Sequence, residues 1–342
     1  MTFDSNSIRQ GFPALTRTLD GRTVAYLDGP GGTQVHSSVI RAMSGFMERG
    51  GSNHGGPFVT SVETGSLTDD ARNAVADLLG AQPNEIVFGQ NMTSLTYALS
   101  RALSRMWVDG DNIILTRLDH DANVAPWLQA ASEAGCEVRF VDFDPDKGCQ
   151  LDLSSLASAL DDRTRLVAFT HASNATGTIT PVSQIVEMAH QAGALTFVDA
   201  VHYAPHGLIN VAENDTDFLV TSSYKWFGPH TGCLYGKARL LEEVLPYKLR
   251  PAPNEIPDSW ETGTQSFESL AGVAAAVDYI ASLGDGDSRR DRIISGYAAI
   301  GAHETSLSNR FLTGLQQIPR AQLFGMPTPQ ARTPTFAIDI AG

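Results

Sequence analysis

Short apolar segments alternate with amphipathic segments through the middle of the chain. The apolar segments are rich in β-branched residues and predict strands, whereas the amphipathic segments repeat with a helical period. Strands are expected at residues 85–89, 112–116, 137–142, 165–170, 194–199 and 217–221, and helices at 95–106, 122–134, 153–160 and 182–192. Apolar strands that alternate with helices are typical of an α/β fold with a mostly parallel sheet covered on both faces. In such sheets, ligands bind beyond the carboxyl ends of the strands.

Further elements are expected on both sides of this alternating region. Upstream, residues 67–79 predict a helix with Ser66 or Thr68 as its N-cap and Gly80 near its end. Downstream, helices are expected at 268–283 and 287–313, and a strand-like run at 333–340 has no partner after it. The pattern predicts a large domain at 22–285. A smaller α+β domain is expected from 1–21 and 286–342, truncated at its C-terminus.

The composition excludes several classes of protein. Lys and Arg number 24 against 38 Asp and Glu, a net charge of −14 over 342 residues. This balance argues against a nucleic-acid partner, which requires a basic surface. The N-terminus lacks the basic and then apolar pattern of a signal peptide, and no apolar run reaches membrane-spanning length. The cytoplasm is therefore the expected location. The three widely spaced cysteines predict neither a disulfide framework nor a metal site.

Among the four lysines, Lys225 has a distinctive environment. It follows an apolar strand and two serines, and it precedes the sequence Trp-Phe-Gly-Pro229. Partly desolvated surroundings disfavour the charged form of a lysine, as an imine-forming amine requires. The alternative is a lysine whose aliphatic stem simply covers aromatic rings.

Asp199 favours the first interpretation of Lys225. It ends an almost wholly apolar strand, where an ionised carboxylate needs a cation. A protonated pyridine nitrogen would be such a cation, although Asp199 could instead cap the segment after it. The strand at 217–221 lies between Asp199 and Lys225 in sequence. Both side chains are therefore expected at the same edge of the sheet.

Three weaker candidates follow other predicted strands. The stretch at 91–94 offers backbone amides and the Thr93 hydroxyl to an anion such as a phosphate, or it is an ordinary helix cap. His120 could stack on a planar ring, or it could be a satisfied polar residue. Asn174 could donate to a phenolate oxygen, or it could be a turn residue before a glycine.

The order of these motifs resembles that of cysteine desulfurases and their class V aminotransferase relatives. Ser222-Ser-Tyr-Lys-Trp-Phe-Gly-Pro229 is similar to their Ser-x-His-Lys-x-x-Gly-Pro signature. The other matching segments, in order, are Phe12-Pro13, Asp119-His120, Ser173-Asn174, Asp199 with His202, and Glu261-Thr-Gly-Thr264. The resemblance covers nearly the whole chain. It implies a fold-type-I enzyme that uses pyridoxal 5'-phosphate (PLP).

The resemblance also implies a role for each matching residue. Lys225 would form the Schiff base, Asp199 would pair with the pyridine nitrogen, and His120 would stack on the ring. Asn174 would lie near the phenolic oxygen, as would His202, which stands where relatives often have glutamine. The phosphate would be held by Met92, Thr93, Ser222, Tyr224 and the partner subunit's Thr264, which implies a homodimer.

The implied activity is that of a desulfurase-like lyase acting on a small amino acid. Class V aminotransferase or amino-acid epimerase activity is the alternative, and a catalytically silent PLP-binding homologue is a third possibility. Tyr224 replaces the usual histidine, and Gly29-Pro-Gly-Gly32 departs from the loop of true desulfurases towards a less characterised branch. The persulfide-forming cysteine and the substrate-carboxylate arginine of the family would lie in a C-terminal region beyond this sequence. Cys136, Cys149 and Cys233 are not expected to replace that cysteine.

Overall fold

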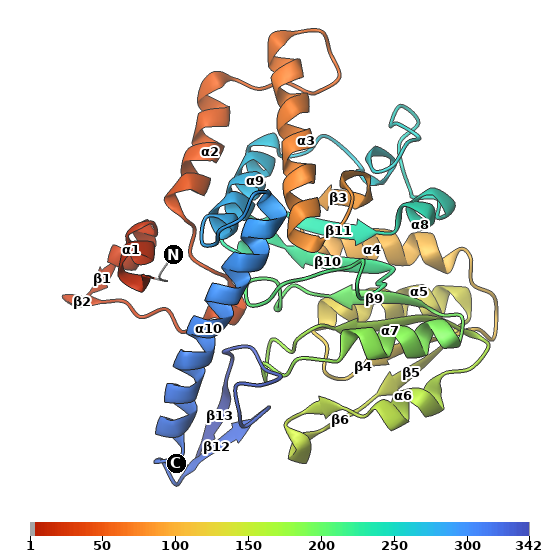
Figure 1. Cartoon of the computed structure of the whole chain (residues 1–342). Helices are drawn as coiled ribbons and strands as arrows, with labels where there is room; N and C mark the ends of the chain where they lie inside the picture. The colour runs from red at the N-terminus through yellow and green to blue at the C-terminus, as the bar shows by residue number, and fades with distance from the viewer. Residues whose placement is uncertain (1–3, 342) are drawn as a thin grey trace.

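A seven-stranded sheet forms the centre of the protein, as the computed structural model shows for residues 4–341 (Figure 1). Its strands are β3 (Ile86–Gly89), β4 (Asn112–Thr116), β5 (Glu137–Val141), β8 (Thr164–Thr170), β9 (Leu195–Asp199), β10 (Phe218–Ser222) and β11 (Gly232–Gly236). They lie in the order β3-β11-β10-β9-β8-β4-β5. Strand β11 is antiparallel to both of its neighbours, and the other neighbouring pairs are parallel. The predicted mostly parallel sheet is confirmed.

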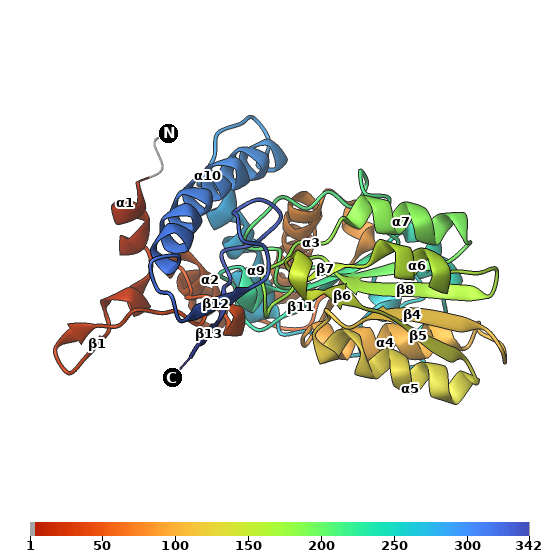
Figure 2. The same ribbon diagram turned by 90° about the horizontal axis from the view of Figure 1, so that it is seen from below.

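Helices cover both faces of this sheet. One layer contains α4 (Met92–Ser104), α5 (Ala125–Ala134) and α8 (Ala238–Glu243), and the other contains α3 (Val59–Leu79), α6 (Leu153–Ala159), α7 (Val182–Gln191) and α9 (Phe267–Ala281). Figure 2 shows α4 and α5 on one side of the strands and α6 and α7 on the other. Alternate strand side chains enter two separate cores, Val198 in the core with α3 and α9, and Phe197 in the core with α4 and α5. This alternation explains why the strands are apolar along their whole length.

The two ends of the chain lie beside the sheet rather than in it (Figures 1 and 2). The N-terminal part contains α1 (Ser5–Gln10), the short strands β1 (Thr18–Leu19) and β2 (Arg22–Thr23), and α2 (Ser37–Arg49). The C-terminal part contains α10 (Arg289–Leu315), β12 (Ala321–Phe324) and β13 (Ala337–Ile340). Within the strand-like run at 333–340, residues 337–340 form β13, which pairs antiparallel with β12, a strand that lies before it in the sequence.

Short elements complete the chain. A small hairpin pairs β6 (Phe143–Asp144) with β7 (Gln150–Leu151). The 3-10 turns are η1 (Pro13–Thr16), η2 (Gly29–Gly31), η3 (Pro83–Glu85), η4 (Asp121–Asn123), η5 (Pro145–Lys147), η6 (Ser223–Lys225) and η7 (Asp258–Trp260). Between residues 4 and 341, every helix is too short or too polar to cross a membrane.

One predicted helix boundary is wrong. Helix α3 begins at Val59, so Ser66 and Thr68 lie inside it rather than at its N-cap. The Thr68 hydroxyl donates to the Thr64 carbonyl at 2.9 Å, a bond that lets a polar side chain sit within a buried helix. Polar and β-branched residues in the first turns hid this helix start from the sequence pattern. The end is as predicted, because Gly80 adopts the left-handed conformation (φ 73°) that terminates the helix.

Candidate active site

The carboxyl ends of neighbouring strands meet around one cavity. Asp199 is the last residue of β9, and Lys225 closes the turn η6 that follows β10. The start of α4 and the turn after β4 complete the same edge of the sheet. Of the residues predicted from sequence, the cavity is lined by Met92, Thr93, His120, Asn174, Asp199, His202, Tyr224 and Lys225. The structure thus brings together most of the candidates.

Lys225 is almost fully buried, with 8% of its surface exposed. Its ammonium donates a hydrogen bond to the carbonyl of Pro30 and lies 5.2 Å from the centre of the Tyr224 ring. Burial lowers the pKa of Lys225, and the nearby Asp199 carboxylate opposes this shift. A lysine with a lowered pKa has more of the neutral amine that attacks carbonyl groups.

Asp199 is a buried carboxylate whose negative charge has few hydrogen-bond donors around it. It is 5% exposed and accepts one hydrogen bond from the described residues, from the Val201 amide at 2.9 Å. Burial raises the pKa of Asp199 to about 6, and the charges of His120 and Lys225 limit the rise. A carboxylate has room for several donors, so Asp199 can still accept a bond from a protonated group inside the cavity.

A polar network behind His120 was missed by the sequence reasoning. The Asp119 carboxyl group accepts hydrogen bonds from the Thr116 hydroxyl and from the Asn123 amide, the latter at 2.7 Å. Burial raises the pKa of Asp119 to about 8. His120 itself accepts a bond from the Ala122 amide through Nδ1 at 3.0 Å, which fixes the orientation of its ring. The acidic residue directly before His120 was the available sequence signal.

The N-terminus of α4 opens at the cavity. Asn91 caps the helix by accepting from the Ser94 amide at 2.9 Å, and Ser94 accepts from the Asn91 amide in return. The Met92 amide donates to the Ser222 hydroxyl at 3.0 Å. Ser222 is therefore bound to the protein at the start of α4 and does not line the cavity. Thr93 is exposed to the cavity at the positive end of the helix.

The Gly-rich loop at 29–32 covers Lys225, which the sequence pattern did not predict. Pro30 accepts the Lys225 hydrogen bond, and the Thr33 hydroxyl donates to the Tyr224 carbonyl at 3.0 Å. Gly32 adopts φ 146°, and a Cβ atom at this position would come within 3.1 Å of the Tyr224 ring. Glycine is needed here because the loop backbone packs directly against the aromatic ring. The Gly-rich composition itself was the usable signal.

His202 reaches the cavity from the segment after β9. Its Nε2 lies 2.9 Å from the Thr335 hydroxyl and 3.1 Å from the Thr333 hydroxyl. Burial lowers the pKa of His202 to about 3, so its ring is neutral near pH 7. Neither threonine was a sequence candidate. Asn174 lines the same cavity from the loop after β8.

Thr264 lies away from the Lys225 cavity of its own chain. It is exposed and lines a different hollow, together with Gln90, Ser94 and His230. Cys233 is a buried residue of β11, and burial raises the pKa of its thiol. A thiol with a raised pKa is a poor nucleophile.

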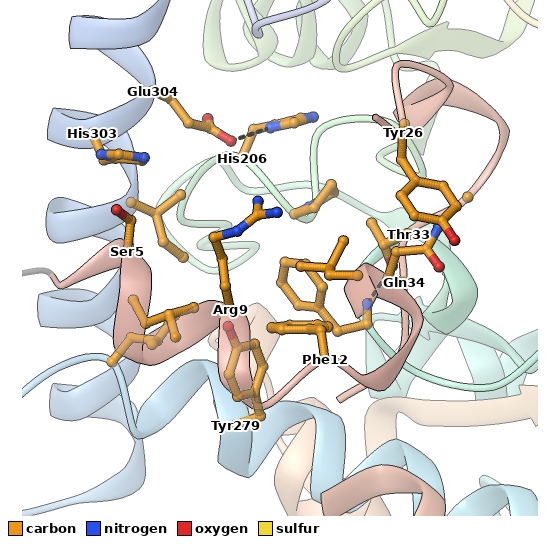
Figure 3. A pocket seen from close by; sticks show the side chains of 18 of the residues that line it. Ser5, Arg9, Phe12, Tyr26, Thr33, Gln34, His206, Tyr279, His303 and Glu304 are labelled. Carbon is orange, nitrogen blue, oxygen red and sulfur yellow. Dashed lines mark hydrogen bonds and ion pairs between the residues drawn. The ribbon is translucent and has the colours of Figure 1, made fainter. Parts of the chain in front are cut away.

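One larger cavity adjoins the Lys225 cavity, and another adjoins that larger one. The first has a volume of about 600 Å³ and shares Pro30, His202 and Lys225 with it, while Phe336 of the C-terminal segment forms its far wall. The second has a volume of about 410 Å³ and shares His206 with the first. Figure 3 shows this second cavity, with Arg9 of α1 pointing towards the hydrogen-bonded pair His206 and Glu304. Cavities that share lining residues thus extend from the Lys225 site to α1 at the N-terminal end of the chain.

Comparison with known proteins agrees with this geometry. The profile of the family described as aminotransferase class-V matches residues 25–342. The chain belongs to this family. It is 32% identical to a cysteine desulfurase of Enterobacter sp. strain 638, over 99% of this chain and 84% of the relative. It is 31% identical to a probable cysteine desulfurase of Synechocystis sp., over 98% of this chain and 80% of that protein.

A solved structure supports the same family assignment. The apo cysteine desulfurase of Thermococcus onnurineus NA1 superposes with a TM-score of 0.87 at 25% identity, over 100% of this chain and 84% of that one. The class V fold therefore extends across the whole chain. The central sheet and its two helical layers are those of a fold-type-I enzyme, as predicted.

Proposed function

We propose that this class V protein is a PLP-dependent enzyme that acts on a small amino acid, most simply as a cysteine desulfurase-like lyase. The observation that carries the proposal is the single buried cavity lined by Lys225 and Asp199 at the carboxyl ends of the strands. The relatives named as cysteine desulfurases support the choice of reaction.

The residues of the cavity fit PLP. Asp199 has unused acceptor capacity for a protonated ring nitrogen. Lys225 is a buried amine with a lowered pKa, as a Schiff-base lysine requires. The first residues of α4, including Met92 and Thr93, present a helix N-terminus to a phosphate. His120 lines the same space and has a fixed ring that can lie against the cofactor.

The cofactor and the residues around it would have distinct roles in the reaction. PLP, when bound, supplies an aromatic ring that accepts electrons from the α-carbon of the substrate. Lys225 would take the proton from that carbon and return one, because a buried lysine of lowered pKa is an effective general base near neutral pH. Asp199 would hold the ring nitrogen in its protonated form. Asn174 and His202 would donate to the phenolic oxygen.

The substrate would enter through the cavity of about 600 Å³ that shares Lys225 with the site. A homodimer is part of this proposal, with the partner subunit's Thr264 and this chain's Ser222 and Tyr224 near the phosphate. Thr264 is exposed on its own chain, where it is free to face a second copy. Aminotransferase or epimerase activity is the alternative reaction for the same cavity, and PLP binding without turnover is the third.

Two measurements test the proposal. PLP added to the purified protein should give a visible absorption band, and borohydride reduction should leave the cofactor mass on the peptide that contains Lys225. A panel of amino acids that includes cysteine, with a thiol as sulfur acceptor, then separates the reactions. Alanine from cysteine indicates a desulfurase-like lyase, a keto acid that forms only when a second keto acid is supplied as amino acceptor indicates an aminotransferase, and an inverted enantiomer indicates an epimerase. Cofactor on any other lysine would refute the assignment.

A further inference from the structure

His202 is held in place by two hydroxyl groups from a distant part of the chain. Its Nε2 contacts Thr335 Oγ1 at 2.9 Å and Thr333 Oγ1 at 3.1 Å. All three side chains are at most 8% exposed. The ring is therefore fixed through Nε2, and Nδ1 is left as the second nitrogen of a residue that lines the Lys225 cavity.

The segment that carries these threonines is anchored to the loop after β8. The Thr333 amide donates to the Gly177 carbonyl at 2.8 Å, and Arg332 donates to the Thr176 carbonyl at 3.2 Å. Gly177 adopts φ 76°, and a Cβ atom there would come within 2.6 Å of the Thr335 carbonyl. The two backbones therefore pack too closely for a side chain between them. The hydroxyls that face His202 have little freedom to move.

The hydrogen-bond donors of this cluster favour one form of the His202 ring. The Thr333 hydroxyl donates to the Gly177 carbonyl, which is 3.4 Å away. The Thr335 hydroxyl donates to His202 Nε2 if that nitrogen carries no proton. With the proton on Nε2, the buried Thr335 donor would lose this acceptor, and unpaired buried donors are unfavourable.

The charge state of the ring agrees with this assignment. Burial, with smaller contributions from the positive charges of His206 and Lys225, lowers the pKa of His202 to about 3. The His206 ring lies 5.4 Å from that of His202. A neutral imidazole has a single N–H group, and the nitrogen that carries it is set by the partner of the other nitrogen.

We propose that Thr335 is a positioning residue that keeps His202 in its Nδ1–H form as a neutral hydrogen-bond donor to an anionic oxygen of the ligand in the Lys225 cavity. The inference rests on the proposed function, in which that oxygen is the phenolate of PLP. A neutral donor stabilises the phenolate without adding a positive charge beside Lys225.

The form of the ring can be measured without any cofactor. In protein labelled with ¹⁵N at histidine, long-range ¹H–¹⁵N spectra distinguish an Nδ1–H ring from an Nε2–H ring. The His202 signal is identified by its loss in His202→Gln. We expect the Nδ1–H pattern in the wild-type protein and in Thr335→Ser, and an Nε2–H or mixed pattern in Thr335→Val. An Nε2–H ring in the wild-type protein would overturn the proposal.

A second measurement uses the protein loaded with PLP. Without a donor to the phenolate, the neighbouring nitrogen contributed by Lys225 holds its proton more tightly. The pH midpoint of the visible absorption should therefore rise by about one unit in Thr335→Val. Thr333→Val should leave the midpoint near its wild-type value, because Thr335 still donates to His202 Nε2, and Thr335→Ser should keep the wild-type midpoint.

The outcomes separate this inference from the proposed function. If the wild-type protein binds no PLP, the proposed function fails, and the NMR measurement alone decides the form of His202. If PLP binds and Thr335→Val has the wild-type midpoint, the positioning role fails and the proposed function stands.

Discussion

Buried carboxylates at the two ends of the central sheet differ in how many hydrogen-bond donors surround them. At the amino ends, Asp217 is 1% exposed and accepts hydrogen bonds from Lys237, His190 and the Thr196 amide at 2.8 to 3.0 Å. At the carboxyl ends, Asp199 is 5% exposed, and among the described residues its carboxylate accepts a hydrogen bond only from the Val201 amide. Both aspartates border apolar strands of the same sheet.

Under the proposed function, this difference separates a structural carboxylate, Asp217, from a cofactor-binding one, Asp199. A buried carboxylate is unfavourable unless donors or cations surround it. Asp217 has such partners within the chain, so it stabilises the fold. Asp199 lacks them, and burial raises its pKa. Groups left undercompensated in a cavity are the usual mark of a site that is completed by a ligand.

Each end of the sheet also has a lysine near its buried aspartate. Replacement of the lysine at the carboxyl end is expected to have the largest effect on activity. Lys225→Ala should remove the visible absorption of bound PLP and lower turnover by about 10²–10⁴-fold, because a general acid/base is lost. Lys237 pairs with Asp215 and Asp217 instead, at 2.6 and 2.9 Å. Lys237→Ala should therefore leave the absorption unchanged and lower only the melting temperature. Equal loss of absorption in both variants would contradict the comparison.

The sequence predicted the carboxyl-end site better than its surroundings. Apolar strands alternate with helices strongly enough to locate β9 and β10, and the ends of these strands place Asp199 and Lys225 together. Such information is local, because it depends on residues within one element or in the next. The order of motifs then supplied the family.

Contacts between distant segments could not be predicted in the same way. Pro30 and Lys225 are 195 residues apart, and His202 and Thr335 are 133 residues apart. No local period connects such pairs, so the covering loop and the threonines were missed. Ser222 shows a further limit. Its hydroxyl accepts the Met92 amide instead of lining the cavity, a contact across 130 residues that no local pattern indicates.

Removal of the Asp217 carboxylate should destabilise the fold, whereas removal of the Asp199 carboxylate should not. Asp217→Asn should lower the free energy of unfolding by about 3–5 kcal/mol, because it breaks a buried pair with Lys237. Asp199→Asn should leave the stability of the cofactor-free protein unchanged or increased, because it removes a poorly compensated charge. Urea unfolding of both variants and of the wild-type protein at neutral pH measures these free energies of unfolding. A large loss of stability in Asp199→Asn would show that its charge is compensated after all.

The pH dependence of stability should reveal Asp199 directly. Burial raises its pKa to about 6, whereas a free aspartate titrates near about 4. The folded protein therefore binds the proton more tightly than the unfolded chain, so this group adds stability as pH falls from about 6 to about 4. The gain is about 3 kcal/mol relative to Asp199→Asn, measured without cofactor. A constant difference between the two proteins across this range would exclude the raised pKa.

The smallest expected effects come from the removal of one buried hydroxyl group at each end of the sheet. The Ser222 hydroxyl accepts the Met92 amide at 3.0 Å, and the Thr196 hydroxyl accepts the Asp217 amide at 3.1 Å. Ser222→Ala should lower the free energy of unfolding by about 1 kcal/mol, because it loses one buried hydrogen bond. Thr196→Val should lower it by about 2 kcal/mol, because the Thr196 hydroxyl also donates to the Asp217 carboxylate at 3.1 Å. Only Ser222→Ala should also weaken PLP binding, since it releases the start of α4 where the phosphate is expected. Fluorescence titration with PLP measures the affinity of each variant for the cofactor. Equal affinities in the two variants would mean that α4 holds its position at the cavity without the bond from Ser222.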